Sequence, residues 1–198
     1  MYVRGTLPRP GIAIVGSRTP PAEAEAFAYD LSRELGEPIV SGLAPGIDVA
    51  AHRGALRAGA PTVAFVGYGF GATDPPAHAE LESAIVAGGG AVATLLPPGT
   101  AASPESSIER DRLQAEHARA IVLICSEIGG GAMYTMRFAK ELERPRFAVM
   151  PPAEMKSRPE WAGNLVCIAE GAMPLPLDLK AAIDLLGALR ARRILRRR

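Results

Sequence analysis

Apolar residues occur along this chain in short continuous runs, and longer amphipathic segments separate these runs. Runs such as "GIAIVG" and "RAIVLIC" show no polar alternation. This pattern is typical of strands that are buried on both faces of a sheet. We expect seven such strands, at positions 11–16, 38–42, 61–67, 90–99, 119–126, 146–152 and 164–169.

The segments between the runs have helical patterns. The segment from Pro21 to Gly36 begins with proline, carries acids in its first turn and ends at glycine. These residues are typical of the start and the end of a helix. Strands that alternate with helices indicate a parallel sheet covered on both faces. We therefore predict an α/β, doubly wound, mostly parallel Rossmann-like domain over residues 1–180, and a basic C-terminal helix or tail over 181–198. The other expected helices cover 46–59, 76–89, 107–118 and 130–143.

Length and composition agree with one intracellular domain. A chain of 198 residues suits a single α/β core. No targeting segment or bilayer-spanning run stands out, so we expect a cytoplasmic protein without membrane contact. Cys125 and Cys167 lie inside apolar runs, where cysteine behaves as a small buried hydrophobe. We expect no disulfide and no metal site.

Charge is unevenly distributed, although the net charge is only +1. The last ten residues, "LRARRILRRR", hold six arginines and no acid, so the rest of the chain has 16 basic and 21 acidic residues. Such a block is usually a solvated end, but it also attracts polyanions by releasing their counterions. A third interpretation is an amphipathic helix that packs through Leu186, Leu189 and Ile194.

Three glycine-bearing loops follow expected strands and precede expected helices. They are "VGSR" at 15–18, "SGLAPGID" at 41–48 and "EIGGGAMYT" at 127–135. Doubly wound folds bind ligands beyond the carboxyl ends of their strands. Backbone amides at a helix start hold phosphate well. Glycine also serves tight turns without a ligand, but three such loops on one edge predict an anionic ligand.

Asp48 and His52 stand at the start of the helix expected over 46–59. Asp48 could cap that helix or organise a ligand loop, and the i, i+4 spacing predicts a hydrogen bond between Asp48 and His52. No serine, cysteine or metal-ligand cluster completes a catalytic site. Tyr68, Phe70 and Tyr134 lie in or beside loops, where they could stack on bases or pack in the core.

The motifs "AIVGSR", "VSGLAPGIDVAAHRGALRAGAPTVAFVGYGF", "LLPPGT", "ERDRLQAEHARAIVLI" and "GGGAMYTMRFA" follow one another in this order. Over residues 11–152 they resemble the Rossmann-like core of the DprA/Smf DNA-processing family. The resemblance implies sequence-independent binding of single-stranded DNA and loading of the recombinase RecA in natural transformation. It also implies a homodimer, without catalysis and without a cofactor.

The family motifs carry over position by position to a set of candidate nucleic-acid-binding and phosphate-binding residues, none of them catalytic or metal-binding. These residues are Gly16, Ser17 and Arg18 in the first loop; Ser41, Gly42, Ala44, Gly46, Ile47, Asp48 and His52 in the second; Arg110 and Arg112; and Gly129, Gly130, Gly131 and Thr135.

The chain departs from the family pattern in several places. Asp111 stands between Arg110 and Arg112 where the family usually has asparagine. This carboxylate should weaken DNA binding unless it points away or pairs with Arg112. The turn at 129–131 is all glycine where the family has Ser-Gly-Ser, so its hydroxyls are lost. We also expect no room for the family's amino-terminal helical module or its carboxy-terminal winged helix.

A different class of protein is the main alternative. Lonely Guy-type nucleotide phosphoribohydrolases have a related fold, with a glutamate three residues after the threonine of a glycine-rich loop. Here Met136, Arg137 and Phe138 follow Thr135, so that carboxylate is absent. A nucleotide-sensing module without turnover is a further alternative. The arginine-rich tail favours nucleic acid, whereas the acidic body and Asp111 partly disfavour it.

Overall fold

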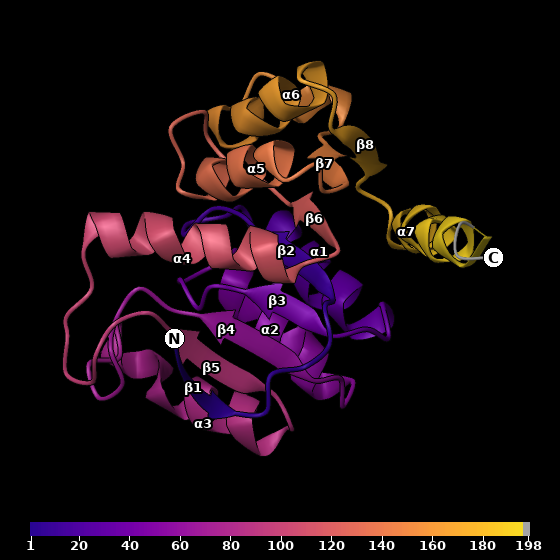
Figure 1. Ribbon diagram of the computed structural model, residues 1–198. Helices are drawn as coiled ribbons and strands as arrows, with labels where there is room; N and C mark the ends of the chain where they lie inside the picture. Colours follow the sequence, from indigo (N-terminus) through magenta and orange to yellow (C-terminus); the bar gives the residue numbers. More distant parts are fainter. Residues whose placement is uncertain (196–198) are drawn as a thin grey trace.

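The computed structural model describes the backbone of residues 1–195 and the side chains of residues 1–188. These residues contain an eight-stranded sheet with the strand order β1-β5-β4-β3-β2-β6-β7-β8 (Figure 1). All neighbouring pairs in it are parallel except β1 and β5. The predicted doubly wound α/β class is confirmed. The strands are β1 (Tyr2–Gly5), β2 (Ile12–Val15), β3 (Ile39–Ser41), β4 (Thr62–Phe65), β5 (Ala91–Thr94), β6 (Ala120–Leu123), β7 (Arg146–Met150) and β8 (Met173–Pro176).

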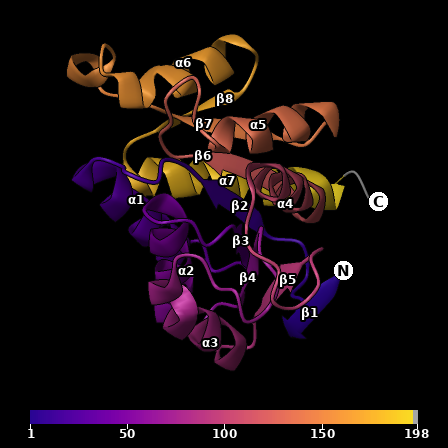
Figure 2. The same ribbon diagram turned by 90° about the vertical axis from the view of Figure 1, so that its left-hand side faces the viewer.

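Helices cover both faces of the sheet, and Figure 2 shows α1, α2 and α3 on the side opposite to α4 and α5. The core has a matching division, since residues of α1, α2 and α7 share one apolar cluster and residues of α4, α5 and α6 share another. The helices are α1 (Ala22–Glu34), α2 (Ile47–Arg57), α3 (Ala79–Ala87), α4 (Pro104–His117), α5 (Ala132–Glu141), α6 (Ala162–Ala169) and α7 (Leu179–Leu195).

The central strands explain why their sequences lack polar alternation. On β2, Ile12 and Ile14 pack under α1 and α2, whereas Ala13 and Val15 pack under α4 and α5. All four are essentially inaccessible to water. Burying a side chain of the size of isoleucine stabilises a fold by about 1.5–3 kcal/mol, so both alternating positions are selected to be apolar.

The seventh predicted strand, at 164–169, is wrong, because these residues form helix α6. A short apolar run cannot be distinguished from a buried helix by periodicity alone. Asn164 holds this segment against the sheet as a helix. Its side-chain amide donates to the carbonyl oxygens of Ile124 (2.8 Å) and Val149 (2.9 Å). The strand that completes this side of the sheet is β8, whose two prolines suit an edge strand.

One further strand and the start of one helix also differ from expectation. Strand β1 was not predicted, because its four residues are all exposed and form no apolar run. Helix α4 begins at Pro104, three residues before its expected start. Ser103 and Ser106 form a capping box there: Ser103 Oγ accepts from the Ser106 amide (3.1 Å), and Ser106 Oγ accepts from the Ser103 amide (2.9 Å).

The carboxy-terminal helix α7 packs on the body through its first turns. Ala182 and Leu186 are buried in the same apolar cluster as residues of α1. Leu189, Ile194 and the arginines of the tail lie outside the described side chains, so their predicted packing or solvation stays a prediction. In the part of the chain that the structure describes, no helix is both long and apolar enough to cross a bilayer.

Candidate binding site at the carboxyl edge of the sheet

A pocket of about 650 Å³ lies at the carboxyl ends of β2 and β6, where the strand order reverses direction. Ligands of doubly wound sheets bind at this kind of reversal. The loop after β2, the start of α2, one face of α4 and the loop between β6 and α5 form its walls. The volume lies within the range of ligand pockets.

Most of the predicted site residues meet here. Nine of them line the pocket, namely Gly16, Ser17, Arg18, Ala44, Asp48, Arg110, Gly130, Gly131 and Thr135. Three others, Ser41, Gly42 and Gly46, support the lining. The remaining four, Ile47, His52, Arg112 and Gly129, lie outside it.

The three supporting residues shape the loop between β3 and α2. Ser41 Oγ donates to the carbonyl of Ile14 (2.6 Å) and so ties β3 to β2. Gly42 gives space to Arg110, because a Cβ at this position would lie 1.4 Å from Nη1 of that arginine. Gly46 has a φ of 76°, in the left-handed region that favours glycine. The backbone here therefore requires these residue types.

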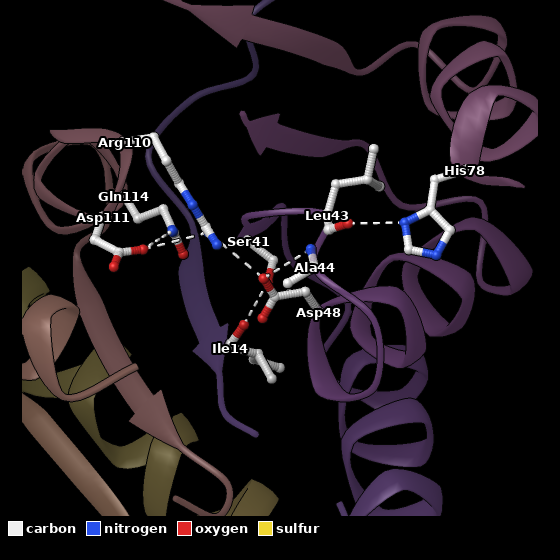
Figure 3. Close-up of polar contacts among 9 residues, drawn as sticks. All are labelled: Ile14, Ser41, Leu43, Ala44, Asp48, His78, Arg110, Asp111 and Gln114. Carbon is white, nitrogen blue, oxygen red and sulfur yellow. Dashed lines mark hydrogen bonds and ion pairs between the residues drawn. The ribbon is translucent and has the colours of Figure 1, made fainter. Parts of the chain in front are cut away.

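Asp48 organises the loop that precedes its own helix (Figure 3). Its Oδ2 accepts from the amide of Ala44 (3.2 Å) and lies 3.5 Å from Nη1 of Arg110. It does not cap α2, because Gly46 occupies the N-cap position and no side-chain cap is formed. Burial raises the pKa of Asp48, and the Arg110 guanidinium partly offsets this rise.

Asp111 neither points away nor pairs with Arg112. Its Oδ1 lies 3.3 Å from Nη1 of Arg110 and accepts from Nε2 of Gln114 at 2.9 Å (Figure 3). One guanidinium thus serves two buried carboxylates. Burial raises the pKa of Asp111 to about 6; Arg110 lowers it, and the nearby Asp48 raises it further.

Arg112 lies on another side of α4 from Arg110, because residues two apart in a helix point in different directions. Its Nη2 is 3.4 Å from Oε2 of Glu141, and its guanidinium lies 4.2 Å from the ring centroid of Phe138. Both partners belong to α5. Arg112 therefore joins two helices and does not share a ligand with Arg110 in the pocket.

The predicted hydrogen bond between His52 and Asp48 is wrong. His52 is fully buried, and its Nδ1 lies 2.7 Å from Oγ1 of Thr62 on β4. Burial lowers the pKa of His52 to about 3, so the ring is neutral at pH 7. Contact of His52 with a ligand is not supported, because the ring has no exposed surface and does not line the pocket.

The loop aromatics divide between the core and the pocket. Tyr68 is buried and its hydroxyl donates to Glu82 (2.6 Å), so it packs in the core. Phe70 lies 5.3 Å beneath the guanidinium of Arg4. Tyr134 lines the pocket and is half-buried, which leaves it as the aromatic group available for stacking.

The start of α4 is a part of the site that sequence reasoning missed. Ser103, Pro104 and Ser107 line the pocket, and α5 begins at the same pocket with Gly131 as its N-cap. Two helix amino termini therefore face the cavity, and the partial positive charge there favours anions. The Ser-Pro pair at 103–104 was the available signal, since serine caps helices and proline follows at the first position.

The charges that line the pocket are mixed. Arg18 and Arg110 face four carboxylates, those of Asp48, Asp74, Asp111 and Glu127. Arg110 is held between two of them, whereas Arg18 is exposed. An anionic group of a ligand is therefore best held by Arg18 and the helix-start amides. Hydrogen-bond donors of the ligand are best held by the carboxylates. No group of three or more metal-ligating side chains occurs among the described residues.

These features define an α/β protein with a pocket of mixed charge at the strand reversal of a doubly wound sheet. The chain matches the DNA recombination-mediator protein A family over residues 1–186, and it belongs to that family. This confirms the resemblance to DprA and Smf proteins.

Named relatives support the same assignment. The DNA processing protein DprA of Mycobacterium tuberculosis is 39% identical over 143 residues, which are 71% of this chain and 36% of the relative. The chain thus spans little more than a third of that protein. The structure of DprA from Streptococcus pneumoniae has a TM-score of 0.79 and 29% identity, with 87% of this chain and 62% of that chain covered.

A further solved structure shares the fold. It is DNA processing protein A from Helicobacter pylori, described for its binding of single-stranded DNA, with a TM-score of 0.79. Its identity is 20%, and the match covers 93% of this chain and 85% of that chain. At this identity the likeness establishes the fold alone.

Proposed function

We propose that this domain binds single-stranded DNA without sequence preference through the pocket at the carboxyl edge. The observation that carries the proposal is the convergence on one cavity of three glycine-bearing strand-end loops and two helix amino termini, with Arg18 exposed beside them. Backbone amides at helix starts bind phosphate groups in any sequence context. The family membership and the described activity of the H. pylori relative support the same ligand.

The acidic side of the pocket favours a single strand over a duplex. Asp74 and Glu127 line the pocket with exposed carboxylates, whose oxygens accept hydrogen bonds. Unpaired bases expose the N–H groups that a duplex uses in pairing, so they can reach these acceptors. Tyr134 adds a stacking surface that tolerates any base.

Fluorescence anisotropy of a labelled oligo-dT, titrated at several salt concentrations with duplex as competitor, tests the proposal. We expect affinity to fall with salt, because bound phosphates release counterions. Arg18→Ala should lower the affinity about ten-fold, because a charge-assisted hydrogen bond is lost. Arg53→Ala, on the exposed face of α2, is the matched control. Equal affinities of the two variants would reject the site, and absence of binding at low salt would reject the function.

A small-nucleotide ligand is the second candidate, because a cavity of about 650 Å³ can enclose one such molecule. Excess nucleoside monophosphate in the same titration separates the two candidates. Full displacement of the oligonucleotide would favour the small nucleotide. We propose binding without turnover, since buried Phe138 lies where the hydrolase needs its glutamate. Released base in a chromatographic assay would contradict this.

Loading of RecA, action in natural transformation and homodimer formation belong to the same proposal, and the family resemblance alone supports them. Sedimentation of the purified chain measures its oligomeric state. Co-precipitation with purified RecA, in the presence and absence of oligo-dT, measures the partnership. A monomer that retains no RecA would restrict the proposal to DNA binding.

A further inference from the structure

A second cavity of about 350 Å³ adjoins the pocket. It lies between α5 and α6, and Gly130 and Tyr134 line both cavities. We call the second cavity the α5–α6 groove. The glycine turn at 129–131 separates the two spaces, and a Cβ placed on Gly129 or Gly131 would meet no atom within 4 Å. A bound chain can therefore approach the backbone of this turn closely.

The floor of the α5–α6 groove is apolar and polarizable. Met133, Met136, Val166 and Cys167 line it, beside the ring of Tyr134. Burial raises the pKa of the Cys167 thiol, so the thiol stays protonated. Such a floor accepts the flat face of a base, because sulfur and aromatic groups pack favourably on π-systems.

The rim of the groove carries two arginines. Arg137 has a side chain that is 57% exposed, and its guanidinium lies 4.9 Å from the ring centroid of Tyr134. Arg146 donates to the backbone carbonyl of Glu170 (2.9 Å), and Lys140 lies 3.0 Å from the carboxylate of that glutamate. The one carboxylate in the groove lining is therefore neutralised by a lysine outside it.

We propose that the α5–α6 groove is a second subsite for the same DNA strand. Nucleotides that leave the pocket cross the glycine turn, stack a base on Tyr134 and Met133, and place their phosphates at Arg137 and Arg146. This inference rests on the proposed function. The groove is continuous with the pocket and has a basic rim, and both features favour a polyanion as its occupant. The exposed side chain of Ile128 would instead suit a polypeptide segment.

Oligonucleotide length separates the two sites. Labelled oligo-dT of about four and about twelve residues spans the usual range of a single-strand site. Arg137→Ala combined with Arg146→Gln should leave the affinity for the short oligomer within about two-fold. For the long oligomer it should lower the affinity about ten-fold and reduce the salt slope by about one to two phosphates. Arg53→Ala with Arg57→Ala, which removes the same charge from the exposed face of α2, is the control.

Photo-cross-linking locates the strand without a change in the protein. We expect 5-iododeoxyuridine at an internal position of the long oligomer to cross-link to Met133, which lines the groove and not the pocket. Unchanged affinity of the double variant for the long oligomer, or cross-links restricted to the pocket, would overturn the subsite and leave the proposed function intact. Failure of the unmodified protein to bind either oligomer would overturn both.

Discussion

At the scale of single residues, the unusual feature is one guanidinium that faces two buried carboxylates. Arg110 lies 3.5 Å from Asp48 and 3.3 Å from Asp111, and both acids are nearly inaccessible to water. One positive charge cannot neutralise two negative charges, and burial penalises the excess. The raised pKa of Asp111 is the result.

This arrangement predicts pH-dependent DNA binding. The pKa of Asp111 is about 6, so the carboxyl becomes protonated as the pH falls through that value and a negative charge leaves the pocket. The affinity for oligo-dT should therefore rise below pH 6. Asp111→Asn should bind several-fold more tightly than the unmodified protein at pH 7.5 and show little change with pH. Anisotropy titrations between about pH 5 and 8 at constant ionic strength measure both effects.

Stability provides a check on the same residue. The folded pKa of Asp111 lies above its ordinary value of 3.8, so ionisation costs stability as the pH rises from about 4 to 6. Asp111→Asn should then increase the free energy of unfolding by up to about 3 kcal/mol at pH 7.5 and much less at pH 4. Denaturant unfolding measures this difference. A pH profile of binding that is identical in the variant and the parent would show that another group titrates.

At the scale of elements, helix starts build the site. Ser103 caps α4 where that helix enters the pocket, and Ser106 Oγ donates to the carbonyl of Gly67 (2.6 Å). The cap therefore fixes the first turn of α4 against the loop after β4. The position of the helix-start amides depends on these contacts.

Loss of the cap should affect both stability and binding. Ser103→Ala should lower the free energy of unfolding by about 1 kcal/mol and weaken oligo-dT binding, because the first turn of α4 loosens. Ser83→Ala is the control: its hydroxyl is exposed on α3 and donates to a carbonyl of its own helix. Thermal unfolding and anisotropy measure the two effects. A loss of stability without a loss of affinity would show that α4 does not contribute to binding.

The buried strands were predictable because both of their faces lie in the core, which leaves continuous apolar runs. The identity of α6 was not, since its apolar run is equally compatible with a strand, and the hydrogen bonds that tie Asn164 to Ile124, just after β6, and to Val149 on β7 involve residues far away in the chain. Strand β1 left no signal, because its pairing with β5 uses backbone groups while its side chains are exposed.

The candidate site was predictable where backbone geometry determines residue type. Gly16, Gly42, Gly46 and Gly130 mark close approaches that few other residues allow, whereas Gly129 and Gly131 have open space around them. Side-chain partners were harder to predict from the sequence. His52 and Asp48 have helical spacing, yet the ring of His52 hydrogen-bonds to Thr62 on β4. Arg110 on α4 likewise reaches Asp48 on α2, because α4 packs over β3 and β4. Such partners depend on packing between elements far apart in the chain.

At the scale of the whole molecule, α7 extends the core beyond the sheet. Leu186 on α7 shares an apolar cluster with Trp161, the chain's single tryptophan, and both are essentially inaccessible. The fluorescence of Trp161 therefore reports whether this part of the core is intact.

Leu186→Ala should lower the free energy of unfolding by about 2–5 kcal/mol, because it removes buried contacts and leaves a cavity. Leu185→Ala is the matched control on the same helix, where the side chain is 40% exposed, and should cost less than about 1 kcal/mol. Urea unfolding followed by tryptophan fluorescence compares the two. Similar values would show that α7 does not stabilise the core.

The strand order also has a consequence for synthesis on the ribosome. Strand β2 emerges long before its neighbour β6, which begins at Ala120, and residues at or just beyond the ends of both strands line the pocket. A nascent chain that ends before β6 can pair β2 with β3 and β3 with β4, but one edge of β2 stays open and the pocket lacks a wall. The pocket is therefore complete only after β6 has been synthesised. A chain that stalls or is truncated before β6 should expose the unpaired edge of β2, which is prone to aggregation, and should have no complete pocket.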